Sequence, residues 1–223
     1  MAFSRLREKS ILFFLFCSGF SALVYQVSWM KLFRLLFGAS TSATAAVLAV
    51  FMGGLGFGCL FFGPRVDEHD SPMGYFARLE ILIAFSCLMS LFLFDIAREL
   101  YLFSGGSACL GFWGATLLRL FLSVAIMGCP CFLMGGTLPA AIRVFLGGGD
   151  VSRSGVGLSY GLNTLGSVLG VLLTTFFFLE HFGIKATFYL ACSLNFVVGT
   201  VAWALSMQEQ GAGESPWECL SEV

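Results

Sequence analysis

Four sulfur-bearing residues lie close together in one apolar stretch of the chain: Met127, Cys129, Cys131 and Met134. Soft thiolate and thioether sulfurs select Cu(I), so this set has the chemistry of a copper site. In an α-helix, however, Cys129 points to the side opposite the other three residues. Only a kink at Pro130 would turn both thiols toward one ion. We therefore predict no metal site, expect no cofactor, and keep the four sulfurs as the weaker alternative.

The Cys-Pro-Cys triplet also occurs in the transport path of copper-pumping ATPases. Those enzymes need phosphorylation and nucleotide-binding domains, for which a 223-residue chain dominated by apolar segments has no room. The same stretch contains helix-breaking residues: Pro130, Gly135, Gly136 and Pro139. Each proline removes a backbone hydrogen bond, and the glycine pair loosens the helix between them. We predict a bent helix here that acts as a hinge or faces a substrate.

The composition indicates a membrane protein. Apolar residues make up 58% of the chain and charged residues 11%, and the mean hydropathy is +0.90. A net charge of −1 provides no basic surface, so nucleic-acid binding is excluded. Six of the eight cysteines fall inside apolar runs, where cysteine behaves as a small hydrophobe, so we expect no disulfide framework.

The charged residues are bunched, and the apolar runs between them approach the ~20 residues that a helix needs to cross a bilayer. We predict an all-α, polytopic bundle of about six membrane helices, at 11–30, 41–63, 76–96, 114–142, 155–179 and 184–207. Residues 31–37 are either an interfacial turn or a continuation of the first span. Residues 97–113 are expected to be an outer loop, with a re-entrant element as the alternative.

The positive-inside rule orients the chain. With both termini in the cytoplasm, about seven basic residues fall inside and about five outside. We therefore expect a basic cytoplasmic segment at 1–10, a membrane domain at 11–207 and an acidic cytoplasmic tail at 208–223, in the cell (inner) membrane. The basic start and the following apolar run are read as a retained span, because no convincing cleavage site follows.

Two spans carry small residues about four apart, which let membrane helices approach each other closely. These residues predict tight helix packing, with a sliding contact between moving helices as the sharper alternative: Gly54, Gly58, Gly157, Gly161, Gly166 and Gly170.

Polar side chains inside membrane spans need a partner or a function. Six such residues are candidates for substrate binding or for lining a cavity: Tyr25, Gln26, Glu80, Thr137, Tyr160 and Asn163. Each has a structural alternative. Glu80 could pair with Arg78, and the two amides could hydrogen-bond across helices. The aromatic rings could attract an ammonium group, although Trp29 is better explained as an interface anchor.

A series of stretches resembles a known family: FCSGFSALVYQVSWMKLFRLLFG, AVLAVFMGGLGFGCLFFGPRVDE, PCFLMGGTLPAAIR and GLSYGLNTLGSVLGVLL. Together they are similar to the membrane domain fused to spermidine-synthase-like proteins in bacteria, which itself resembles one half of a major facilitator transporter. The resemblance covers about residues 12–205. In the facilitator-like loop GPRVDEHD, Gly63 and Asp67 match, whereas Glu68 to Asp70 replace the usual basic residues, which puts the salt-bridge role of the loop in doubt.

The resemblance implies transport or delivery of a small molecule, with a polyamine as one substrate. Relatives continue into an aminopropyltransferase-like domain, but the residues after 207 cannot form its Rossmann-type cofactor site. No acid–base pair, Ser/His/Asp set or zinc spacing is evident in the sequence either, so we do not expect an enzyme. The alternative function is a non-catalytic membrane anchor or scaffold for a soluble enzyme. Besides the lipid bilayer, the expected partners are a second copy of the chain and a separately encoded synthase-like protein.

Overall fold

The computed structural model describes the backbone of residues 2–103, 106–146 and 153–213, and this part of the chain contains helices and no strand. The elements in chain order are α1 (Ala2–Phe37), α2 (Thr41–Asp67), α3 (Pro72–Phe103), α4 (Gly106–Gly135), α5 (Thr137–Leu146), α6 (Arg153–Leu173), the π-helical turn η1 (Thr174–Phe178), α7 (Leu179–His181) and α8 (Gly183–Gly213). The predicted tail falls partly outside the described residues, which end at 213.

Six stretches are long and apolar enough to cross a membrane: Lys9–Phe37, Thr41–Asp67, Pro72–Phe103, Gly111–Phe145, Gly155–His181 and Gly183–Gln208. The predicted all-α bundle of six membrane helices is therefore confirmed. Residues 31–37 continue the first span, and α1 ends where Gly38 adopts a φ of +81°.

The predicted outer loop at 97–113 is wrong. Residues 97–103 form the last turns of α3, and α4 already begins at Gly106 with a kink at Gly111, whose φ is +65°. Charged residues suggested a loop, but Arg98 and Glu99 form an ion pair of 3.2 Å on the exposed side of α3. Because both side chains are exposed, α3 continues through this segment without burying either charge.

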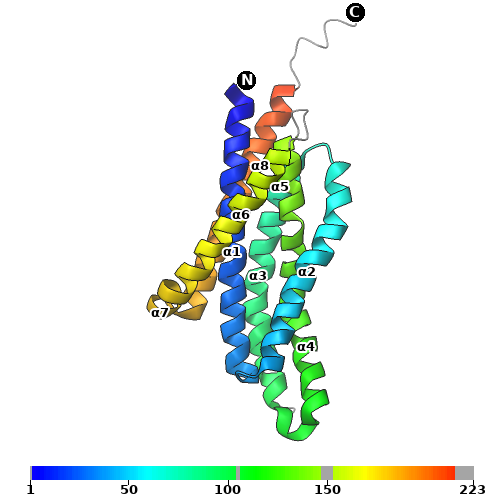
Figure 1. Ribbon diagram of the computed structural model, residues 1–223, viewed down its shortest axis with the longest axis vertical. Coiled ribbons are helices and arrows are strands. Elements are labelled where there is room, and N and C mark those ends of the chain that lie inside the picture. The colour runs from blue at the N-terminus through cyan, green and yellow to red at the C-terminus, as the bar shows by residue number, and fades with distance from the viewer. Residues whose placement is uncertain (1, 104–105, 147–152, 214–223) are drawn as a thin grey trace, which may run out of the picture.

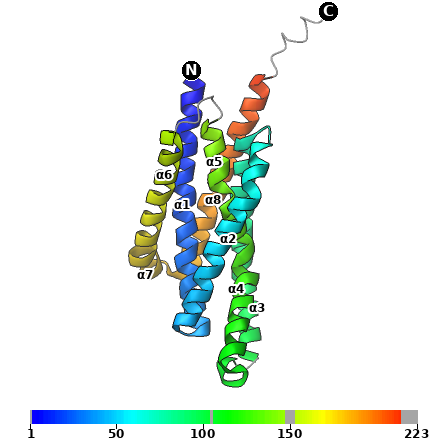
Figure 2. The ribbon, with the colours of Figure 1, turned by 45° about the vertical axis from the view of Figure 1, so that its right-hand side comes forward.

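The helices form an elongated bundle in which the start of α1 and the end of α8 lie at the same end (Figure 1). Helix α1 packs against α6 and α8, α2 packs against α4, and α3 packs against α8 and α4. Figure 2 shows α6 and α2 on either side of α1. The two glycine-rich helices thus lie at the flanks of the bundle, each against one principal partner.

Helices α2 and α4 meet backbone to backbone at their glycines. A Cβ atom added to Gly58 would collide with the carbonyl oxygen of Phe132 and lie 3.0 Å from the Cα of Gly135. One turn earlier, a Cβ on Gly54 would lie 2.6 Å from the Cβ of Cys131. This seam excludes any side chain larger than hydrogen at these positions.

A second seam joins α1 to α6. Added Cβ atoms on Gly166 and Gly170 would collide with the carbonyl oxygens of Phe16 and Phe20. Gly157 and Gly161 were also expected to pack against another helix. No atom lies within 4 Å of a Cβ built on either residue, so they make no such contact within this chain. The side of α6 that packs on α1 is therefore the one that carries Gly166 and Gly170, and the fully buried Ser159 lies in the first half of the same helix.

The fourth membrane span is broken at Gly136, between α4 and α5. A Cβ on Gly136 would lie 2.7 Å from the Phe62 ring, so the close approach of this ring favours glycine at the break. Pro139 lies in the first turn of α5, where its missing N–H costs little. The chain is not broken at Pro130, the other predicted hinge position, because α4 continues through this residue.

The ends of α2 and α5 are joined by a side-chain contact. Arg143 Nε lies 3.7 Å from Asp67 Oδ1, and both side chains are largely exposed. Asp67 therefore has a basic partner on another helix, in place of the basic residues that its own loop lacks. An exposed pair of this kind contributes little stability, about 0–1 kcal/mol.

Candidate functional site

A groove of about 400 Å³ is lined by residues of α1, α2 and α6 and of the α4–α5 break. Three of the six candidate residues line it, from two different helices: Thr137, Tyr160 and Asn163. Most of the remaining wall is apolar. Hydroxyl groups are added by Ser18 and Ser167, two residues that were not among the predicted site residues.

Several hydroxyl groups of this polar groove are held by backbone carbonyls. Thr137 donates to the carbonyl of Met134 at 2.9 Å, which satisfies one acceptor freed by the helix break. Ser167 lies 3.1 Å from the carbonyl of Gly19 and 2.9 Å from that of Asn163. Because these donors are already used, the two hydroxyls can offer a ligand only their acceptor capacity.

Asn163 is the best-placed recognition residue of the groove. Its side-chain oxygen lies against α1, 2.7 Å from a Cβ built on Gly19, so only a glycine at that position leaves room for the amide. No hydrogen bond to this amide is present in the described part of the chain. Tyr160, one turn away on α6, is 61% exposed. An amide and a phenol can together donate and accept hydrogen bonds.

Serine residues could have been selected by spacing. Ser167 follows Asn163 by one helical turn, and Ser18 adjoins the glycine that faces the amide. Met52, Cys59 and Met134 also line the groove. Residue spacing identifies side chains that are neighbours on one helix. It cannot identify the residues that α2 adds to the groove, because these depend on how α2 packs against α4.

Tyr25 lies in the bundle core and not in the groove. Its ring and that of Trp29 are fully buried, with centroids 5.7 Å apart, and both pack against Phe188. Trp29 Nε1 donates to Ser90 Oγ at 3.1 Å, so it is a core residue and the expectation of an interface anchor is wrong. Neither aromatic face is open to a cationic ligand.

Gln26 is partly exposed and is not part of the groove lining. It follows Ala22 and Leu23, which do line the groove, by about one turn of α1. Gln26 therefore extends the same face of α1 toward the other end of the bundle.

Glu80 is fully buried, and both carboxyl oxygens lack a hydrogen-bond partner among the described residues. It does not pair with Arg78, whose guanidinium lies over the Trp203 ring at 5.5 Å. Ser18, which itself lines the groove, is a polar neighbour of the Glu80 carboxyl group. Glu80 thus lies one layer behind the groove wall, separated from it by a serine.

Replacing Glu80 with glutamine is expected to leave the protein at least as stable as the parent. The change keeps the size of the side chain and removes a buried carboxyl group that is costly to charge in the interior. Thermal unfolding in detergent measures this, with Glu99→Gln as the exposed control. A drop of several degrees for Glu80→Gln alone would contradict it, because it would mean that the carboxylate is stabilised.

The four sulfur-bearing residues of α4 lie on two sides of the helix, as their spacing predicted. Met127, Cys131 and Met134 are buried, whereas Cys129 is exposed. Among the described residues no group of three or more His, Cys, Asp or Glu side chains could hold a metal ion. Cys129 is therefore separated by its exposure from the other three sulfur residues, which lie in the packed interior.

The remaining buried charge, Arg119, lies far from this groove in the fold. Its guanidinium donates to the Tyr101 hydroxyl at 3.4 Å and to the Ser42 hydroxyl at 3.5 Å. These long bonds link α4 to α3 and α2. We interpret Arg119 as a structural tie between three helices.

No family model, curated protein or solved structure matches this chain. Membership of the spermidine-synthase-associated membrane domain therefore stays a prediction from sequence motifs. The fold, the groove and its polar residues stand on the structure alone.

Proposed function

We propose that this protein is a membrane module for the transport or delivery of a small molecule, which binds in the polar groove. The supporting observation is that Thr137, Tyr160 and Asn163 share one groove at a broken membrane helix. Irregular backbone at membrane depth is tolerated where it is enclosed or lines a cavity. The hydrogen-bonding groups left available, on Asn163 and Tyr160, are those that a ligand would use.

The lining favours a particular substrate chemistry. None of the residues that line the groove is charged, and most are apolar. A molecule with an apolar body and a few hydrogen-bonding groups matches this wall better than a polycation does. A polyamine, suggested by the sequence resemblance, would have only the Tyr160 ring and neutral oxygens as partners for its ammonium groups.

We also propose that a second copy covers the groove. Six spans make half of a facilitator-like bundle, and the fifth span, which contains α6, is the least buried of the six, at 17% of its most apolar window. Helices α2 and α6 both line the groove and lie on either side of α1 (Figure 2). A copy placed against both would enclose the ligand. The start of α1 and the end of α8 lie at one end of the bundle (Figure 1), which we assign to the cytoplasmic side of the inner membrane from the positive-inside count.

Substitution of Asn163 tests the proposal. Uptake and binding of labelled small molecules, with polyamines and uncharged polar compounds in parallel, are measured in proteoliposomes. Asn163→Ala is expected to weaken binding of the transported compound by about tenfold, since a hydrogen bond of about 1–1.5 kcal/mol is lost. The matched control is Thr164→Ala, on the exposed side of the same helix, where the hydroxyl bonds only to the backbone of Tyr160.

The alternative function is a membrane anchor or scaffold for a soluble enzyme. It is favoured by the placement of Tyr25 and Glu80 inside the packed bundle. If the parent protein neither binds nor moves any compound of the panel, the transport proposal is overturned and the anchor remains. If it transports a compound and Asn163→Ala behaves as Thr164→Ala does, the groove is not the site.

A further inference from the structure

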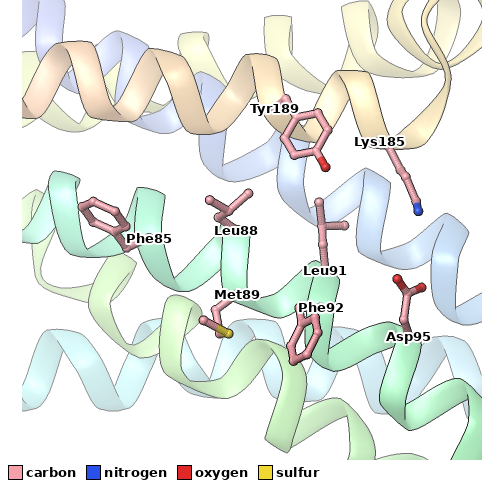
Figure 3. Close-up of a pocket in the computed structure, with 8 residues that line it drawn as sticks. All are labelled: Phe85, Leu88, Met89, Leu91, Phe92, Asp95, Lys185 and Tyr189. Carbon is pink, nitrogen blue, oxygen red and sulfur yellow. The ribbon is translucent and has the colours of Figure 1, made fainter.

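A second groove, of about 600 Å³, lies on another face of the bundle, between α3 and α8 (Figure 3). Its apolar wall includes Phe85, Met89 and Phe92 of α3. All three side chains are more than half exposed. Since α3 is a membrane span, this wall faces the lipid phase.

One end of this α3–α8 groove is polar. Asp95 of α3 and Lys185 of α8 lie on opposite sides of it, and the phenol oxygen of Tyr189 points toward the same end (Figure 3). Both charged residues belong to the described part of the chain, and no ion pair joins them within 4.0 Å. The groove therefore ends in one carboxylate and one ammonium that do not neutralise each other.

The position along the helices places this polar end near the membrane surface. Lys185 follows directly on Gly183 and Ile184, where both α8 and the sixth span begin. Phe85 lies ten residues before Asp95 on α3, which corresponds to about 15 Å of helix. The apolar wall therefore extends from the charged end into the hydrocarbon region, as a lipid acyl chain does.

We propose that the α3–α8 groove binds a zwitterionic phospholipid with a primary ammonium headgroup, of the phosphatidylethanolamine class. An acyl chain lies along Phe85, Met89 and Phe92, Lys185 binds the phosphate, and Asp95 accepts hydrogen bonds from the ammonium group. Charge-assisted hydrogen bonds of this kind are roughly twice as strong as neutral ones. The headgroup thus supplies a partner to each of two charges that are costly to leave unpaired at a membrane span.

Charge complementarity distinguishes this lipid from the other common classes. An anionic headgroup such as phosphatidylglycerol would pair with Lys185 and leave Asp95 facing a second negative charge. A choline headgroup has the correct charges but no N–H to donate to Asp95. The carboxylate is therefore the residue that selects for a primary ammonium.

A third groove provides an internal comparison. It has about 580 Å³, lies between α1 and η1, and contains Lys31 and Arg34 but no carboxylate. A groove with two cations and no anion attracts phosphate without selecting the headgroup amine. Lys31→Gln is therefore a matched control, because it removes one lipid-facing ammonium from a groove that lacks the selecting group.

The experiment measures lipid retention by native mass spectrometry of the full chain. The protein is released from vesicles with equal amounts of phosphatidylethanolamine, phosphatidylcholine and phosphatidylglycerol that carry identical acyl chains. The parent and Lys31→Gln are expected to retain the ethanolamine lipid several-fold over the others. Asp95→Asn is expected to lose this preference, Lys185→Gln to lower retention of all three lipids, and Asp95→Glu to keep the preference.

The unfolding temperature of each variant is measured alongside, and substitution at these lipid-facing positions is expected to change it little. Equal retention of the three lipids by the parent would overturn the proposal. So would an unchanged preference in Asp95→Asn, because the carboxylate would then not select the headgroup. If Asp95→Asn fails to fold, loss of the preference in a folded Asp95→Ser protein supports the proposal, and its persistence there overturns it.

Discussion

Alanine at Gly58 is expected to destabilise the bundle by about 1–3 kcal/mol or more, through the seam between α2 and α4. The added methyl group would meet only backbone atoms, namely the carbonyl of Phe132 and the Cα of Gly135. Backbone cannot change rotamer, so the two helices would have to separate along their length. The apparent unfolding temperature and the monodisperse fraction on size exclusion in detergent both measure the effect.

Gly53→Ala is the matched control on the same helix. No atom lies within 4 Å of a Cβ built on Gly53, and alanine is favoured over glycine in a helix by about 1 kcal/mol. This variant is expected to be as stable as the parent or slightly more stable. Equal behaviour of the two variants would show that α2 and α4 do not meet at Gly58.

Truncation of Trp29 to alanine is expected to have the largest effect of any single side chain, a loss of about 3–5 kcal/mol. The indole is fully buried between Tyr25 and Phe188 and donates to Ser90. Its removal leaves a cavity at the contact of three helices, α1, α3 and α8. Unfolding in detergent or mixed micelles measures the loss.

Two further variants separate the effect of burying the Trp29 ring from the effect of its hydrogen bond to Ser90. Trp29→Phe retains an aromatic ring and is expected to cost less than Trp29→Ala, while it loses the hydrogen bond to Ser90. Trp113→Ala removes an indole that is 76% exposed and is expected to change stability by less than about 0.5 kcal/mol. If Trp29→Ala were as mild as Trp113→Ala, Trp29 would have to lie at the membrane interface, as its sequence position first indicated.

The polar residues show the limit of prediction from spacing. Thr137, Tyr160 and Asn163 were selected as polar groups in apolar spans, and the structure brings these three together in one groove. Tyr25 and Glu80 were selected by the same criterion and lie in the packed interior. Polarity within a span is a local property, whereas the direction in which a side chain points depends on the neighbouring helices.

Glycine spacing has the same limit. Gly161 and Gly166 are five residues apart, which is about 140° around an α-helix, so the first faces open space while the second faces the backbone of Phe16. The four glycines therefore form two smooth faces, one with Gly157 and Gly161 and one with Gly166 and Gly170. Their spacing cannot tell which face receives a partner helix, because that depends on where α1 lies in the bundle.

The sequence by itself determined the class of the protein and the number of its membrane spans, because the transfer of an apolar run into hydrocarbon is a sum over neighbouring residues. It also marked residues 130–139 as a weakened helix. Only the tertiary structure decided that the break falls at Gly136, where Phe62 leaves no room for a side chain. It likewise decided which polar groups share a groove and that Asp95 faces Lys185, because contacts between distant segments depend on helix packing that no local pattern encodes.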